Sequence, residues 1–348
     1  MTWDEHGTES LDVRVIDGKY ELDRTLGTGG MGSVVKARHR FTGRQVALKL
    51  LHEHIARSER FTERFLREAQ TAAQLRHPRV VDVLDAGRDP EGTLYIAFEL
   101  LEGEDLNERA QRRKLTLEEM VEVGVQALDG LEAAHAAGLI HRDIKPANIF
   151  LERGTRISVK IVDFGIATEI RALDPSRRRL TQAGMVMGTP VFMSPEQMCA
   201  DPLDGRTDLW SLAVSLYFGL TLTLPFKNAD LQPLLLEVMQ NGSKPIRTER
   251  PDLPPAADVF FRTAFSSAME DRHADLQAMR TALQLLVAPT SLDDETVDFH
   301  SSAPDTPDRR RHPGLEALAE LEREVQRLQA PDTMPTGRSP AARRPHRS

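Results

Sequence analysis

Cysteine, aromatic residues and long apolar runs are all scarce in this chain of 348 residues. Its one cysteine, Cys199, excludes an internal disulfide framework and is typical of a protein in the reducing cytoplasm. Residues 1–18 mix charged and polar side chains with no apolar core, so no secretory signal is visible. The uncharged stretch 211–226 contains Ser, Thr and Gly, whereas a membrane-spanning helix needs about 20 mostly apolar residues. We therefore expect a cytoplasmic protein without a membrane anchor, in which 211–226 form a buried helix and its turn.

An excess of positive charge is lacking as well. The 45 Lys and Arg residues are outnumbered by 53 Asp and Glu residues, which gives a formal net charge of −8. Nucleic acids and anionic membranes are therefore not the default partners of this protein. What remains is the composition of a soluble globular protein, 40% hydrophobic and 28% charged, with enough residues for one large or two ordinary domains.

Hydrophobic periodicity indicates that the first part of the chain is rich in strands. Short alternating or β-branched runs predict strands between residues 20 and 50, at 80–84 and at 93–98. A serine cap and an apolar stripe predict one helix among them, over 58–76. The stripe consists of Phe61, Phe65, Ala69 and Ala72.

Helical periodicity predominates after Leu101. Helices are expected at 116–137, 206–220, 229–240, 256–269 and 274–287. The whole pattern predicts an α+β fold with two lobes that join near residues 99–104. The small β-rich lobe with one main helix spans 20–100, and the larger, mostly α-helical lobe spans 101–288.

The two ends of the chain differ from this body in composition. Residues 1–19 are interpreted as an N-terminal extension, and 289–348 as a largely disordered tail rich in Pro, Ser, Asp and Arg. Near 314–330 the pattern predicts a short amphipathic helix whose apolar face is formed by Leu315, Leu318, Leu321, Val325 and Leu328. Such a helix would serve homodimerisation or partner docking, and the alternative is a marginal helix in a flexible tail.

A glycine-rich segment, LGTGGMGSV at 26–34, lies between two predicted strands. Its glycines at 27, 29 and 32 allow backbone N–H groups to approach phosphate oxygens, because no Cβ intervenes. A strand follows the segment rather than a helix, which argues against a dinucleotide-binding βαβ unit. The alternative interpretation is a glycine-rich hairpin turn.

Lys49 lies among apolar residues of a predicted strand, in the segment VALKLL. The ammonium of a half-buried lysine has to meet a negative group, and a phosphate or a carboxylate would serve. Glu68 in the following helix is the candidate for the carboxylate. The alternative for Glu68 is a solvated position on the helix surface.

The segment HRDIKPANIF, 141–150, crowds several charged and polar side chains together. Asn148 and Asp163, the latter in IVDFG, offer the oxygen ligands that Mg²⁺ prefers. Asp143 then remains to accept and orient a hydroxyl proton, and Lys145 to neutralise a phosphoryl group in transit. Catalysis of this kind consists mostly of positioning and electrostatics.

In order and spacing these segments resemble the eukaryotic-like protein kinase family over residues 20–288. The H-R-D-x-x-x-x-N motif occurs at 141–148 and D-F-G at 163–165, while A-P-E appears as Ser-Pro-Glu at 194–196. Arg272 matches the family arginine that pairs with this glutamate. Asp208 matches the buried aspartate that braces the catalytic loop, although Ala213 stands where glycine is usual.

The resemblance implies a two-lobed kinase fold that uses ATP and Mg²⁺, with Mn²⁺ as a possible substitute. Adenine would lie between apolar side chains, with backbone hydrogen bonds from the lobe junction. The implied nucleotide-binding residues are Leu26, Gly27, Thr28, Gly29, Gly30, Met31, Gly32, Ser33, Val34, Ala47, Lys49, Glu68, Phe98, Glu99, Leu101 and Phe150. For the apolar ones, simple core packing is the alternative.

The loop D-I-K-P-x-N, with Lys145, looks like the serine/threonine branch of the family, and several segments look most like its bacterial members. Thr189 matches the threonine that bonds the catalytic Asp and Lys in this branch. Thr181 lies where bacterial relatives place an autophosphorylated threonine, and Arg142 could pair with such a phosphate. Many of those relatives carry a membrane helix and an extracellular sensor, which we do not expect here.

The expected function is therefore phosphorylation of serine and threonine in protein substrates, including the enzyme itself, in bacterial signal transduction. One alternative is a pseudokinase that acts as a binding module. Such proteins usually lose one of four residues whose counterparts are all present here, Lys49, Asp143, Asn148 and Asp163. The other is a kinase of small molecules, a class that lacks the GTP…SPE segment found at 188–196.

Overall fold

The computed structural model describes residues 14–29, 32–52, 59–164 and 190–288. Contacts divide the chain into two units, Met1–Ser291 and Leu292–Ser348. All described residues belong to the first unit. The helix expected near 314–330 lies outside the described residues, and the predicted lobe and tail boundaries stay predictions.

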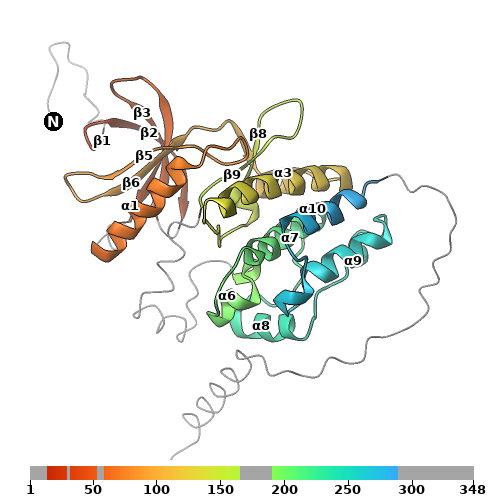
Figure 1. Cartoon of the computed structure of the whole chain (residues 1–348). Helices are drawn as coiled ribbons and strands as arrows, with labels where there is room; N and C mark the ends of the chain where they lie inside the picture. The colour runs from red at the N-terminus through yellow and green to blue at the C-terminus, as the bar shows by residue number, and fades with distance from the viewer. Residues whose placement is uncertain (1–13, 30–31, 53–58, 165–189, 289–348) are drawn as a thin grey trace, which may run out of the picture. The chain divides into compact units, whose positions relative to one another are not determined.

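The first lobe is built on a six-stranded antiparallel sheet with one main helix, as predicted (Figure 1). In spatial order its strands are β1 (Val15–Ile16), β2 (Tyr20–Gly29), β3 (Gly32–His39), β4 (Gln45–Leu51), β6 (Leu94–Glu99) and β5 (Val83–Arg88). Helix α1 (Glu59–Gln74) contacts β5. The four residues of its predicted apolar stripe are all buried, because this stripe is the face that covers the sheet.

The strand predicted at 80–84 is wrong in its first half. Val80 forms only an isolated parallel bridge with Ile161, and the Val81 N–H donates to the Ile161 carbonyl at 3.0 Å. Both valines are buried, and β5 begins only at Val83. The apolar run therefore indicated burial correctly, but burial against the second lobe produces the same pattern as burial within a sheet.

The second lobe is mostly helical and carries a small sheet of three strands (Figure 1). Its helices are α2 (Leu106–Arg112), α3 (Leu117–Ala136), α6 (Pro195–Cys199), α7 (Arg206–Thr221), α8 (Leu231–Met239), α9 (Pro255–Ala264) and α10 (Leu276–Leu285). The strands are β7 (Gly103–Asp105), β8 (Ile149–Glu152) and β9 (Val159–Ile161). Helix α9 is shorter than predicted, because Phe265 ends it and a 3₁₀ turn follows at Met269–Asp271.

Helix α7 forms the centre of the second lobe. It is buried almost all round, so the stretch 211–226 is the buried helix and turn that the sequence predicts. Its polar residues are accommodated because Ser215 and Thr221 donate to carbonyls one turn earlier, both at 2.8 Å. No helix in the described ranges is both long and apolar enough to cross a membrane.

Candidate active site

The loop that precedes β8 is anchored by one buried carboxylate, Asp208 in the first turn of α7. Its Oδ2 accepts from the His141 N–H at 2.8 Å, and its Oδ1 accepts from the Arg142 N–H at 2.8 Å. His135 of α3 contacts Oδ2 through Nε2, also at 2.8 Å. Three polar contacts therefore hold in place a carboxylate that would otherwise be costly to bury.

Asp143 follows these anchored residues and meets both of its sequence-predicted neighbours. The Lys145 ammonium donates to its Oδ2 at 2.8 Å, and the Asn148 amide donates to its backbone carbonyl at 2.7 Å. The Asp143 side chain is 40% exposed, so a hydroxyl group can reach the carboxylate. The loop thus presents a partly exposed carboxylate and an ammonium group side by side.

Asp163 connects this loop to the first lobe. Its carboxylate forms an ion pair with the Lys49 ammonium on β4. Burial alone would raise the pKa of Asp163, but the charge and hydrogen bond of Lys49 outweigh burial and lower it. Asp163 therefore stays ionised at neutral pH, the form in which a carboxylate can coordinate a metal ion.

The structure pairs Lys49 with Asp163, whereas the sequence offered Glu68 as the candidate carboxylate. Among the described carboxylates, Asp163 is the ion-pair partner of Lys49. The alternation of β4 determines on which face of the sheet Lys49 lies, but it does not identify the carboxylate that pairs with Lys49. Glu68 makes an interaction of its own.

Phe164 fastens the D-F-G segment to the catalytic loop. Its ring is buried, with its centroid 4.8 Å from that of His141. The Asp143 N–H donates to His141 Nδ1 at 3.3 Å, which leaves His141 Nε2–H to donate to the Val162 carbonyl at 3.0 Å. The imidazole of His141 thus links the two segments that carry Asp143 and Asp163.

The glycine-rich segment forms the end of the β2–β3 hairpin. A Cβ added at Gly27 would meet no atom within 4 Å, so the space beside it is open. At Gly32 a Cβ would lie 1.9 Å from the Leu50 carbonyl oxygen, so this glycine is required by the close approach of β4. Thr28 pairs with Ser33 across the hairpin. Gly30 and Met31 lie outside the described residues, as do Thr181 and Thr189.

The residues expected around adenine come from neighbouring strands. Ala47 pairs with Phe98 across β4 and β6, while Val34 pairs with Lys49 across β3 and β4. Phe98 is only 8% exposed and belongs to the core, so core packing accounts for much of its role. Leu26 is exposed, and Phe150 lies on β8.

The lobe junction contains a polar group that the sequence did not single out, Lys160 of β9. Its ammonium donates to Glu99 Oε1 at 2.6 Å, and the Asp82 N–H donates to the same oxygen at 2.8 Å. The Leu101 backbone has no hydrogen-bond partner within the described ranges, so its N–H and C=O remain available to a ligand. The sequence pattern that could have identified Lys160 is a lysine between apolar strand residues, the same pattern that singled out Lys49.

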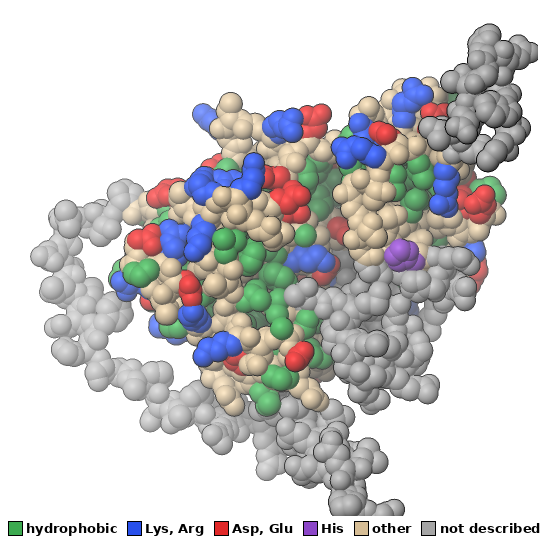
Figure 2. Space-filling view, turned by 180° about the vertical axis from the view of Figure 1, so that it is seen from behind, with side chains coloured by type: hydrophobic (Ala, Val, Ile, Leu, Met, Phe, Trp, Pro, Cys, Tyr) green, Lys and Arg blue, Asp and Glu red, His purple; other side chains and the backbone are tan. Residues whose placement is uncertain are grey.

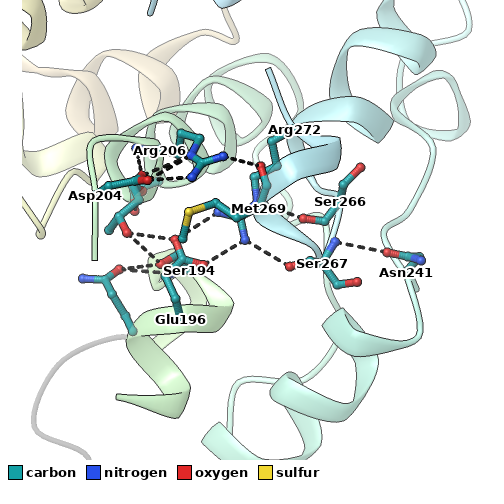
Figure 3. A network of polar contacts seen from close by, with 12 residues as sticks. Ser194, Glu196, Asp204, Arg206, Asn241, Ser266, Ser267, Met269 and Arg272 are labelled. Atoms are coloured by element: carbon teal, nitrogen blue, oxygen red, sulfur yellow. Dashed lines mark hydrogen bonds and ion pairs between the residues drawn. The ribbon is translucent and has the colours of Figure 1, made fainter. Parts of the chain in front are cut away.

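A second ion pair lies under α6. Arg272 binds Glu196 through two bonds of 3.0 and 2.8 Å, and both side chains are buried (Figure 3). The Thr207 hydroxyl donates to Glu196 at 2.8 Å. Arg272 also lies over the ring of Trp210 at 4.8 Å. This pair matches the Glu–Arg pair expected from the sequence.

Two side chains could share a divalent cation. The Asn148 amide nitrogen is used by Asp143, while no described residue donates to its Oδ1. Together with the ionised carboxylate of Asp163 this makes an all-oxygen donor set, which suits Mg²⁺ or Mn²⁺. On the face shown in Figure 2 the surface is hollowed between the two lobes, with charged and hydrophobic side chains around the hollow.

Comparison with known proteins agrees with this geometry. The family model described as protein kinase domain matches residues 20–285. Serine/threonine-protein kinase Pkn3 of Myxococcus xanthus is 38% identical over 282 residues, 80% of this chain and 51% of that protein. Serine/threonine-protein kinase PknA of Mycobacterium tuberculosis is 38% identical over 245 residues, 69% of this chain and 54% of that protein. The chain thus spans about half the length of these relatives.

A solved structure extends the similarity to the fold. The crystal structure of the Mycobacterium tuberculosis PknI kinase domain is 28% identical, with a TM-score of 0.63. It covers 80% of this chain and 100% of its own. The chain therefore belongs to the protein kinase family, in which it is similar to bacterial serine/threonine-protein kinases.

Proposed function

We propose that this protein transfers the γ-phosphate of ATP to serine and threonine hydroxyls of proteins, itself included, in bacterial signal transduction. The observation that carries the proposal is that two contacting pairs, Lys49 with Asp163 and Asp143 with Asn148, lie on segments joined by a hydrogen bond from the Val162 N–H to the Asn148 carbonyl at 3.0 Å. A pseudokinase usually lacks one of these four residues. The similarity to serine/threonine-protein kinases supports the choice of acceptor.

Each residue is given a role in this proposal that is compatible with its position. ATP supplies an activated phosphoryl group when bound, and a metal ion lowers its negative charge. Asn148 and Asp163 would hold Mg²⁺, or Mn²⁺ in its place, and Lys49 would hold phosphate oxygens. Asp143 orients the acceptor hydroxyl and takes its proton. Lys145, bonded to Asp143, neutralises charge where the phosphoryl group passes.

Regulation and partners remain proposals from the sequence. A phosphate on Thr181 would pair with Arg142 and order the segment that contains Thr189. Homodimerisation or partner docking through the helix near 314–330 is proposed in the same way, as is a cytoplasmic location. Deleting 289–348 and measuring activity and molecular mass tests the role of the tail.

Lys49→Met is expected to reduce phosphoryl transfer by about 10²-fold or more, because the phosphates lose the cation that places them. The test incubates wild type and variant with labelled ATP and Mg²⁺ and a generic basic protein, followed by phosphoamino-acid analysis. Label on serine or threonine in the wild type alone supports the proposal. Nucleotide binding by a wild type that transfers no label would indicate a pseudokinase instead.

Lys160→Met is expected to raise the KM for ATP about fivefold with a smaller change in kcat, because Glu99 loses a charged hydrogen-bond donor at the lobe junction. Steady-state kinetics with varied ATP measures both constants. Lys244→Met is the matched control, since Lys244 pairs with Glu249 away from the junction. Equal KM values in the two variants would show that Lys160 has no part in nucleotide binding.

A further inference from the structure

Arg142, the residue before Asp143, has a backbone conformation that L-residues rarely adopt. Its φ is +64°, in the left-handed region. Such a conformation is unfavourable for any residue with a Cβ, so it persists only where the surroundings hold it. Here both sides of the residue are held by side chains. The N–H donates to Asp208 at 2.8 Å, and the carbonyl accepts from Gln197 Nε2 at 2.8 Å.

Gln197 uses the two ends of its amide for different purposes. Its Oε1 accepts from the Ser194 N–H at 3.0 Å, as part of the capping box that begins α6. Its Nε2 extends to the carbonyl of Arg142 in the catalytic loop. A glutamine can do both because it carries an acceptor and a donor, whereas a glutamate carries only acceptors.

Helix α6 provides a firm support for this contact. The residue beside Gln197 is Glu196, which is buried and bound by Arg272 and Thr207 (Figure 3). A positioning group is accurate only when its own support is fixed by packing and hydrogen bonds. The Glu196 network supplies that support within one residue of Gln197.

We propose that Gln197 is a positioning residue for Asp143. By holding the Arg142 carbonyl it ties the catalytic loop to the segment Ser194–Gln197, so that the orientation of Asp143 depends on that segment being in place. The inference rests on the proposed kinase function for its kinetic consequences. The structural consequence is independent of that function: without the hydrogen bond from Gln197 to Arg142, the catalytic loop should be more mobile.

Two reciprocal variants separate positioning from helix capping. Gln197→Glu keeps the acceptor for Ser194 and removes the donor to Arg142, so we expect kcat to fall about tenfold while Tm and the KM for ATP stay near wild type. Gln197→Lys keeps a donor and removes the acceptor, so we expect a lower Tm with kcat closer to wild type. Gln277→Glu on the exposed face of α10 controls for the added charge and should leave both unchanged.

Amide hydrogen exchange of the peptide that contains 141–148 gives an independent reading. We expect faster exchange in Gln197→Glu than in wild type or Gln197→Lys. The proposal would be overturned if Gln197→Glu had the kcat and the exchange rate of wild type. It would also be overturned if Gln197→Glu and Gln197→Lys lost kcat equally. If wild type transfers no phosphate, the proposed function fails, and the exchange comparison still decides whether Gln197 positions the loop.

Discussion

Asp143→Asn is expected to lower kcat by about 10²-fold or more while ATP binding stays nearly unchanged. Asparagine has almost the same shape and can still accept a hydrogen bond from Lys145, but it cannot take a proton from the acceptor hydroxyl. Initial rates of phosphoryl transfer at saturating ATP measure the effect. Titration calorimetry with ATP and Mg²⁺ measures the binding.

A suitable control for this experiment is Asp252→Asn. Asp252 also forms an ion pair, with Arg250 at 2.7 Å, but it is 62% exposed on the second lobe. Its loss should change the rate by less than about twofold, because exposed ion pairs contribute little. A near-wild-type rate in Asp143→Asn would exclude Asp143 as the proton acceptor.

Arg272→Met is expected to lower the free energy of unfolding by about 3–5 kcal/mol, because it leaves the buried carboxylate of Glu196 without its partner. Urea denaturation followed by fluorescence measures this change. Arg38→Met removes an exposed ion pair with Glu21 and should cost less than about 1 kcal/mol. Similar losses in the two variants would contradict a special role for the buried pair.

The same pair has a pH dependence whose sign can be derived. Burial by itself would raise the pKa of Glu196, but the hydrogen bonds and charge of Arg272 lower it below its ordinary value. In wild type the pair therefore contributes stability above the unfolded pKa, and this contribution is lost as the pH falls through the folded pKa. In Arg272→Met burial is opposed only by the Thr207 hydroxyl and a backbone N–H, so we expect the pKa of Glu196 to rise. The variant then loses stability as the pH increases through that raised pKa.

Unfolding experiments at about pH 5 and pH 8 test this reversal. The free energy of unfolding of Arg272→Met should fall further below that of wild type at pH 8 than at pH 5. In the double variant Glu196→Gln/Arg272→Met the carboxylate is gone, so this additional loss at pH 8 should disappear. If the loss of unfolding free energy in Arg272→Met were independent of pH, Glu196 would not be left charged and buried in that variant.

The general fold could be predicted from sequence because periodicity and motif spacing are local signals. Helix α7 and the apolar stripe of α1 are confirmed, since each depends on a repeating pattern within one element. The choice of a partner across the molecule could not be predicted in the same way. Lys49 needed a carboxylate, but the pattern of its strand could not distinguish Asp163 from Glu68.

The contacts that support the site could not be predicted from the sequence either. Gln197 and Lys160 each act through one hydrogen bond to a residue far along the chain. A single polar side chain on a short helix or strand has no periodicity, so its partner becomes visible only when the elements are packed. The left-handed backbone conformation of Arg142 could not be predicted from the sequence either, because arginine has no preference for that conformation.

A crystal structure of the protein with Mg²⁺ and a non-hydrolysable ATP analogue tests the central claim most directly. We expect a metal ion coordinated by Asn148 Oδ1 and the Asp163 carboxylate, phosphate oxygens in contact with Lys49, and Asp143 free to face the terminal phosphate. Nucleotide bound elsewhere, or a metal ion that contacts neither Asn148 nor Asp163, would contradict the account.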